Sequence, residues 1–212
     1  MDISMEEKLP GAKELEILYK SPKITVKGDV ILLEMPNFQL FQQVHRNAKN
    51  QQFTHYSSRP FDIITGYKFR LLIFTNGYGA AKDKSISIYL QLMKSEDDSW
   101  LTYPFNGILT FAILDKSEGG TEHHWKRIIA RGTKKFFQKQ TSENNPVYGV
   151  ENFLSLNTLE EKRGSFIRNN TIVVAIAIRY HEYLEIGSSH PLYLTMVYKQ
   201  KRENLKQFPR DI

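Results

Sequence analysis

Alternation of apolar and polar side chains with a period of two is the feature that most constrains this chain. Residues 85–92 read Ser-Ile-Ser-Ile-Tyr-Leu-Gln-Leu, so Ile86, Ile88, Leu90 and Leu92 share one face of an extended strand. Full burial of each of these aliphatic side chains would contribute roughly 1.5 to 3 kcal/mol. A slip of one residue would expose all four, so the register of this strand is strongly specified.

The same period recurs along the chain and predicts a sheet protein. The extended segments are separated by loops rich in Gly, Asn, Ser and Lys. We predict strands over 23–27, 30–35, 67–75, 85–93, 108–114, 153–156 and 171–180, and one short helix near 38–48. Many short strands with few helices are typical of an antiparallel β-sandwich, so the predicted fold class is all-β.

Composition excludes several classes of function. The chain has 212 residues, of which 41% are hydrophobic, enough for one full-sized domain. It has no cysteine, which excludes disulfides, thiolate zinc sites and a cysteine nucleophile. No run of about 18 apolar residues is present, so we expect no membrane span. The first residues lack the pattern of a secretory signal, so we expect a cytoplasmic protein.

The titratable residues predict neither a catalytic nor a metal site. His123 and His124 are adjacent and cannot share one face of a helix, which favours loop histidines over metal ligands. The segment that begins at His181 and Glu182 lacks the second histidine of a zinc-protease helix. No order of Ser, His and Asp stands out as a nucleophilic triad. We therefore expect no enzyme activity, no catalytic residues, no metal and no cofactor.

Positive charge is concentrated in two segments. Residues 126–139 contain six bases and no acid, and residues 198–212 contain five bases and two acids, in a chain of net charge +6. With Trp125, Phe136 and Phe137 available for stacking, the first segment and the tail are a candidate surface for nucleic acid or another anionic partner. A solvated loop is the more common role of such a segment, so this is the alternative function and nucleic acid is not the expected partner. The basic patch consists of Lys126, Arg127, Arg131, Lys134, Lys135 and Lys139.

Side-chain directions in two neighbouring strands leave apolar groups facing solvent. Leu72 and Phe74 share a strand face with Lys68 and Arg70, and we place this mixed face outward. Tyr89 lies opposite the four aliphatic residues of its own strand, so it also points outward. Exposed apolar patches on an otherwise polar face tend to bind something, which makes this face the candidate binding surface.

Five blocks of sequence occur in the order found in one known family. They are GYKFRLLIFTNGYG at 66–79, SISIYLQLMK at 85–94, WLTYPF at 100–105, ILD at 113–115 and SFIRNNTI at 165–172. Together they resemble the MATH domain, and most closely the C-terminal domain of tumour necrosis factor receptor-associated factors, over about residues 28–179. The entry strand also resembles the family, although its usual Trp is replaced by Leu33.

The resemblance implies an eight-stranded antiparallel β-sandwich, which agrees with the alternation. It also implies a non-enzymatic adaptor role in signalling. In this family an extended peptide of a receptor, adaptor or substrate protein adds to a sheet edge, and its side chains enter shallow pockets.

The resemblance divides the chain into three parts. We expect an N-terminal extension over 1–27, the MATH-like sandwich over 28–180 and a basic C-terminal extension over 181–212 that could add a strand. Family members trimerise through a coiled coil before this domain, and 1–27 is too short for the heptads that a stable coil needs. A homo-oligomer would therefore form without a coiled coil of its own. The RING and zinc fingers that carry ubiquitin-ligase activity in full-length members are absent from this sequence.

The implied peptide site departs from the family pattern. The Arg that pairs with an acidic peptide side chain falls at Leu72, the usual Tyr falls at Phe74, and the acid of the turn falls at Tyr78. The aromatic residue of the next strand is kept as Tyr89, and a flanking glycine is kept as Gly149. The implied peptide-binding set is Leu72, Phe74, Tyr78, Tyr89, Phe137, Tyr148, Gly149 and Val150.

The departure at Leu72 changes the expected ligand. A guanidinium offers a carboxylate a bidentate, charge-assisted pair, whereas Leu72 offers only apolar surface. We expect an altered motif preference, with an apolar or aromatic anchor in one pocket. That pocket would consist of Leu72, Phe74, Tyr89, Phe137 and Tyr148.

Two alternatives remain open from the sequence. Lys82, Lys134 or Lys135 could supply the missing positive charge from a loop. Residues 192–198 alternate like a strand and could cover the peptide face within the same chain.

Overall fold

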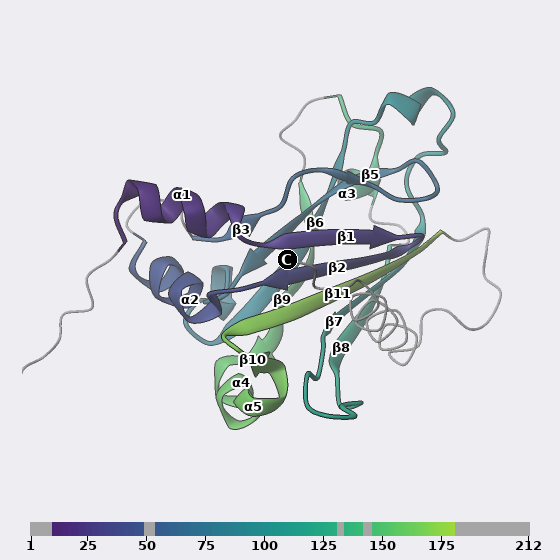
Figure 1. Ribbon diagram of the computed structural model, residues 1–212. Helices are drawn as coiled ribbons and strands as arrows, with labels where there is room; N and C mark the ends of the chain where they lie inside the picture. The colour runs from purple at the N-terminus through teal and green to yellow at the C-terminus, as the bar shows by residue number, and fades with distance from the viewer. Residues whose placement is uncertain (1–9, 49–53, 131–133, 142–145, 181–212) are drawn as a thin grey trace, which may run out of the picture.

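The computed structural model describes residues 10–48, 54–130, 134–141 and 146–180, which form two antiparallel sheets packed face to face (Figure 1). The first sheet has the order β1-β2-β11-β7-β8, with β10 paired to β11. Its strands are β1 (Lys23–Lys27), β2 (Val30–Met35), β7 (Gly107–Ile113), β8 (His124–Ile129), β10 (Ile167–Arg168) and β11 (Thr171–Tyr180).

The second sheet lies behind the first in Figure 1 and has the order β3-β5-β6-β9, with β4 paired to β5. Its strands are β3 (Tyr56–Ser57), β4 (Phe61–Asp62), β5 (Lys68–Phe74), β6 (Ser85–Met93) and β9 (Val147–Ser155). Within the described residues, β3, β4 and β10 have only two residues each. The other eight strands build the antiparallel sandwich, which confirms the predicted fold class.

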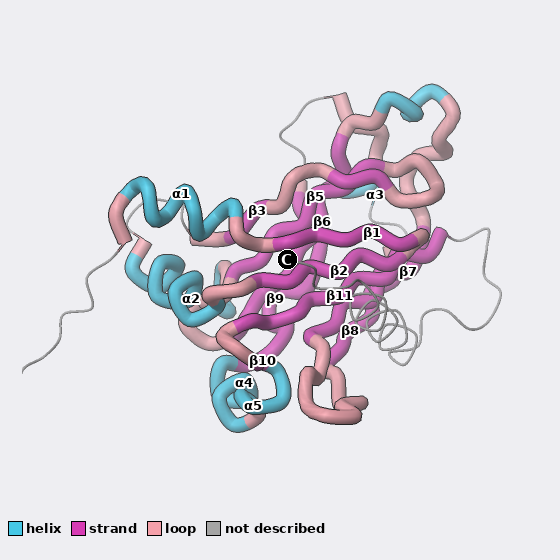
Figure 2. Tube along the Cα trace, viewed as in Figure 1, coloured by secondary structure: helices cyan, strands magenta, loops and turns pink. Residues whose placement is uncertain are grey.

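Short helices lie at the ends and edges of the sandwich (Figure 2). The predicted helix is present as α2 (Phe38–Asn47), and its apolar stripe of Phe38, Phe41 and Val44 is buried. The other helices are α1 (Ala12–Lys20), α3 (Lys134–Phe137), α4 (Leu156–Glu161) and α5 (Arg163–Phe166), with 3-10 turns η2 (Gly79–Ala81) and η3 (Glu96–Ser99). None of the helices in the described part of the chain is long and apolar enough to cross a membrane.

The main core lies between the sheets and follows the predicted side-chain alternation. On β6, Ile86, Ile88, Leu90 and Leu92 are each at most 1% exposed, which confirms the register argued from sequence. The facing strand β11 contributes its own alternate set to the same core. That set is Ile172, Val174, Ile176 and Ile178.

Two regions differ from the organisation predicted from the sequence. β8 was not predicted, because its burial alternates only between half-buried and exposed side chains and basic residues occupy two of its six positions. In the predicted N-terminal extension, the predicted strand over 23–27 is confirmed as β1, which pairs with β2, whereas α1 was not predicted and its Leu18 is 2% exposed in the main core. The folded unit therefore includes parts of residues 1–27. The strand predicted from the alternation over 192–198 lies outside the described residues.

Candidate functional site

Three predicted site residues form their own apolar cluster on the outer face of the second sheet. Leu72 and Phe74 come from β5 and Tyr89 from β6, and Val147 of β9 packs against them. The cluster is separate from the main core, so the predicted direction of these side chains is correct. The predicted exposure of this patch to solvent is wrong. Each of the three is only 6 to 9% exposed, because these residues pack against one another and against neighbouring rings.

Tyr78 and His55 complete this aromatic surface. The Tyr78 ring lies 4.8 Å from the Phe74 ring and 5.8 Å from the Tyr89 ring, measured between centroids. His55 stacks on Phe74 with centroids 4.7 Å apart. Tyr78 is 52% exposed, so it is the member of the cluster most accessible to a partner. We call Leu72, Phe74, Tyr78 and Tyr89 the outer cluster.

Hydrogen bonds hold the loop that carries Tyr78 against β6 and β9. The Tyr78 N–H donates to Ser87 Oγ at 3.0 Å, and the Ala80 N–H donates to Glu151 Oε1 at 2.6 Å. Burial, together with the smaller effect of the Glu151 charge, raises the pKa of the Tyr89 hydroxyl to about 12. Tyr89 is therefore neutral throughout the physiological range, as suits a surface for an apolar group.

A cavity of about 480 Å³ opens beside the outer cluster. It is lined by His45, Ala48, Thr54, His55, Phe74, Asn76, Gly77, Tyr78, Gly79 and Lys82. Burial lowers the pKa of His45 to about 3, and burial also lowers the pKa of His55. Both imidazoles are therefore neutral at pH 7, so among the described residues of this wall the positive charge comes from Lys82.

His45 is held in the wall of the cavity by two elements. Its Nδ1 lies 2.7 Å from the Thr75 hydroxyl, and its Nε2 lies 3.0 Å from the Tyr19 hydroxyl of α1. Neither His45 nor His55 was singled out from the sequence, because neither lies in a strand or motif that marked the binding face. Only the packing of α2 and residues 54–55 against the end of β5 brings them together.

The strand β9 is an edge strand of the second sheet and lies next to the outer cluster. Tyr89 is paired with Gly149, and Leu72 is paired with Tyr89, so the three residues form a row from the sheet edge inward. Gly149 has no side chain to cover this row. A Cβ at this position would lie 2.1 Å from the Ile88 carbonyl oxygen, which explains why glycine is needed here.

The remaining predicted site residues lie on the other side of the second sheet. Tyr148 and Val150 flank Gly149 and pack toward the main core, because alternate residues of a strand point to opposite faces. Phe137 is 1% exposed in that core, where its ring lies 5.5 Å from Phe105 and 5.1 Å from Tyr148. The single pocket predicted from Leu72, Phe74, Tyr89, Phe137 and Tyr148 is therefore divided by the sheet.

The basic patch is also divided where the structure describes it. Lys126 and Arg127 are neighbours on β8 and point to opposite faces. The Lys126 ammonium donates to the Asn152 carbonyl oxygen, and the Arg127 guanidinium lies 5.7 Å from the Trp125 ring centroid. Lys139 is exposed after α3. Arg131 and the side chains of Lys134 and Lys135 lie outside the described part, so the predicted anionic surface remains a prediction.

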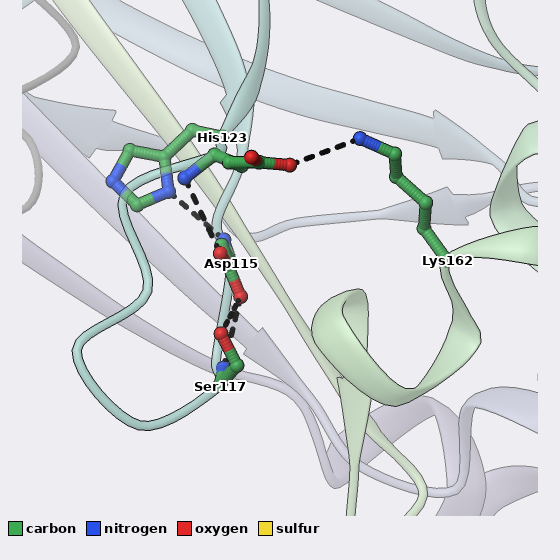
Figure 3. Close-up of polar contacts among 5 residues, drawn as sticks. Asp115, Ser117, His123 and Lys162 are labelled. Atoms are coloured by element: carbon green, nitrogen blue, oxygen red, sulfur yellow. Dashed lines mark hydrogen bonds and ion pairs between the residues drawn. The ribbon is translucent and has the colours of Figure 1, made fainter.

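One group of Ser, His and Asp does come together, in the loop between β7 and β8 (Figure 3). The Ser117 hydroxyl donates to Asp115 Oδ1 at 2.6 Å, and the Asp115 N–H donates to His123 Nδ1 at 2.9 Å. Desolvation raises the pKa of Asp115, but hydrogen bonds from Ser117 and Glu122 outweigh it and the pKa is lowered overall. In a nucleophilic triad the imidazole bonds the hydroxyl and the carboxylate bonds the imidazole.

The hydrogen bonds of this loop stabilise its conformation and do not follow the order of a triad. Here the Asp115 carboxylate accepts a hydrogen bond from the Ser117 hydroxyl directly, and His123 Nδ1 accepts one from the backbone N–H of Asp115. Glu122 of the same loop forms an ion pair with Lys162, at the junction of α4 and α5, at 3.2 Å, which ties the loop to the end of the sandwich. No group of three or more His, Asp or Glu side chains in the described ranges could hold a metal ion.

Known proteins match this chain in sequence and in fold. A family model for the MATH domain matches residues 33–178. TNF receptor-associated factor 5 of Mus musculus is 30% identical over 122 residues, which cover 57% of this chain and 22% of that protein. TNF receptor-associated factor 1 of Homo sapiens is 26% identical over 131 residues, which cover 62% of this chain and 31% of that protein.

A solved structure shares the architecture. The structure of Notothenia coriiceps TRAF5 aligns with a TM-score of 0.66 at 24% identity and covers 74% of this chain and 76% of that chain. The chain thus spans less than a third of the length of the two sequence relatives above. The family model spans most of the sandwich, from β2 to β11. The chain therefore belongs to the MATH domain family.

Proposed function

We propose that this MATH domain binds an extended peptide of another protein by adding it as a strand to the β9 edge. The observation that supports this function best is the row Gly149, Tyr89 and Leu72, which leads from that edge into the outer cluster. Proteins named TNF receptor-associated factors are its sequence relatives, so a receptor tail, an adaptor or a substrate segment is the proposed partner. The proposed role is a non-enzymatic adaptor.

The two halves of β9 differ in their suitability for an added strand. Side chains of β8 reach the later half, where His124 Nε2 lies 2.6 Å from the Phe153 carbonyl oxygen and Lys126 bonds the Asn152 carbonyl. Residues 147–150 are half-buried and pair with β6 on one side. An edge strand offers unpaired backbone N–H and C=O groups to another chain. We therefore assign the peptide backbone to the stretch 147–150.

The outer cluster favours an apolar or aromatic anchor on the peptide. Edge-to-face contact with Phe74, Tyr78 or Tyr89 is worth about 0.5 to 1.5 kcal/mol beyond the burial of area. The cavity next to the cluster has neutral imidazoles in its wall and gives a large side chain room to enter. Lys82 also lines this cavity. A contact between this loop lysine and an acidic group of the peptide therefore remains the alternative.

Arg70 adds a hydrogen-bond donor to the same face. It lies two residues before Leu72 on β5, opposite Gln91 of β6. Its Nε is buried and has no hydrogen-bond partner among the described residues. A buried donor without an acceptor costs about 1 to 3 kcal/mol. An oxygen of the peptide placed near Arg70 would remove that cost, so we propose a carbonyl or carboxylate beside the apolar anchor.

Truncation of the outer cluster is expected to weaken peptide binding strongly without unfolding the domain. Tyr78→Ala removes an exposed ring, and Tyr89→Ala removes the ring next to the β9 edge. Loss of a central aromatic anchor typically costs at least about 2 kcal/mol, or roughly 30-fold in affinity. The measurement is binding to an array of peptides centred on aromatic residues, compared with an array centred on acidic residues.

The control for this experiment is Trp125→Ala, which removes a ring that is 44% exposed on the other sheet. This variant should bind the same peptides as the wild type, and the melting temperatures of all three variants show whether they fold. Unchanged binding by both folded outer-cluster variants would place the peptide site elsewhere.

A second variant tests the anchor preference directly. Leu72→Arg restores a guanidinium at the centre of the row, where it can form a bidentate pair with a carboxylate. We expect the acidic array to gain affinity and the aromatic array to lose it, by roughly tenfold or more each. Leu72→Met, which keeps the position apolar, is the matched control. An identical ranking of the two arrays for both variants would contradict the proposed role of Leu72.

A further inference from the structure

Two parallel rows of paired residues cross the outer face of the second sheet. The first is the row that leads from Gly149 at the β9 edge to Leu72 on β5. The second lies two residues away along each strand and therefore on the same face, because alternate residues of a strand point to the same side. We call it the Arg70 row, and it consists of Arg70, Gln91 and Val147.

Arg70 brings an unpaired positive charge to this second row. Its Nε is buried and has no hydrogen-bond partner among the described residues. Lys68, two residues earlier on the same face, is already paired with Asp62 at 3.6 Å. No carboxylate in the described part of the chain forms an ion pair with Arg70. A guanidinium stays charged at all physiological pH values, so this group is suited to bind a carboxylate.

The opposite end of the outer cluster carries a negative charge. Glu151 lies on β9 four residues after Val147, and its Oε1 accepts a hydrogen bond from the Ala80 N–H at 2.6 Å. This carboxylate acts on the cluster, because its charge adds to the effect of burial in raising the pKa of the Tyr89 hydroxyl. An acidic side chain of a peptide beside β9 would therefore be attracted to the Arg70 end and repelled at the Glu151 end.

We infer that the site recognises a glutamate two residues away from the apolar or aromatic anchor of the peptide. The inference rests on the proposed peptide function and specifies its motif. In a strand added to β9, the residues opposite Gly149 and Val147 are two positions apart and point to the same face. The first would lie beside the outer cluster, and the second would face the Arg70 row.

The distance across the sheet suits a glutamate. Three strand spacings, about 14 Å in all, separate the backbone of β5 from an added strand. From standard bond lengths, an extended arginine reaches about 7 Å from its Cα and an extended glutamate about 5 Å. One hydrogen bond adds about 2.9 Å, which closes the gap. Aspartate is shorter by one methylene group, so we expect it to bind less well at this position.

A set of peptides with one phenylalanine anchor in a neutral sequence can test the inference. A single glutamate is moved through the four positions on each side of the anchor. We expect roughly tenfold higher affinity or more with glutamate two residues to one side, and no gain two residues to the other side, where it would meet Glu151. The favoured position follows the anchor if the peptide is antiparallel to β9 and precedes it if the peptide is parallel.

Variants of the protein then assign the gain to one side chain. Arg70→Gln should remove it, so that the peptides with and without the glutamate bind equally. Arg163→Gln makes the same substitution in α5 and is the matched control, which should keep the full gain. If circular dichroism shows that Arg70→Gln does not fold, Arg70→Lys replaces it. Lysine keeps the charge but loses the bidentate contact, so the gain should fall.

Three outcomes would overturn the inference while leaving the proposed function in place. They are equal affinity for every position of the glutamate, a full gain that persists in folded Arg70→Gln, and a gain that is lost in Lys82→Gln instead. The last would assign the carboxylate to the loop lysine. Failure of every peptide to bind, with or without glutamate, would contradict the proposed peptide function itself and this inference with it.

Discussion

Replacement of Gly149 by alanine is expected to lower the free energy of unfolding by about 3 kcal/mol or more. The added Cβ would lie 2.1 Å from the Ile88 carbonyl oxygen and 2.5 Å from the Tyr89 Cα. Both are backbone atoms of the central strand β6 and cannot rotate away. The strand β9 would have to move away from β6, which would break the pairing that positions the edge next to the outer cluster.

Chemical denaturation of the purified domain measures this effect, and Gly164→Ala is its matched control. A Cβ at Gly164 in α5 meets no atom within 4 Å, so alanine there should be neutral or stabilise by up to about 1 kcal/mol. Equal stabilities for the two variants would show that β9 can shift without cost, and the glycine would then have no packing role.

The stability of the domain is expected to fall as the pH is lowered below about 6.5, and His45 is the main cause. Burial lowers the pKa of His45 from its ordinary value of 6.5, which we take for the unfolded chain, to about 3 in the folded chain. Between these two values the unfolded chain binds a proton that the folded chain does not. The stabilising effect of neutral His45 is therefore fully present above pH 6.5 and is lost as the pH falls toward 3.

The expected slope from this one group is about 1.4 kcal/mol per pH unit in that window. His55 and His124 add to it in the same direction, because burial lowers the pKa of each. Denaturation curves at a series of pH values from 7.5 to 5 measure the slope. His45→Gln removes the titrating group, so its curve should be flatter by that amount. An unchanged slope in this variant would mean that His45 does not control the acid sensitivity.

The alternation of apolar and polar residues predicted the strands well, because it can be recognised within each strand alone. The alternate aliphatic residues of β6 specify its register and its inward face without reference to any other strand. The same reasoning placed Leu72, Phe74 and Tyr89 outward, and the structure confirms that they lie outside the main core. Elements with weaker signals were not predicted, among them β8, where charge obscures the alternation, and α1, whose Leu18 is its only fully buried residue.

The candidate site was predicted less completely, because a resemblance aligns positions and does not orient side chains. Tyr148 and Gly149 are neighbours in sequence but lie on opposite faces of β9. A pocket that included both Tyr89 and Tyr148 could not form across the sheet. His55 was not predicted, because it lies outside the strands and motifs that marked the binding face. Only the fold brings its ring against Phe74.

The period of two by itself determined that this chain is an antiparallel sandwich, and the order of its blocks indicated the family. These properties are encoded locally, because the burial of alternate side chains depends only on the direction of each strand. The tertiary structure alone decided which side chains from distant segments share a surface. That depends on strand order and pairing, which bring Gly149 beside Tyr89 and leave Phe137 in the core, and no local pattern contains this information.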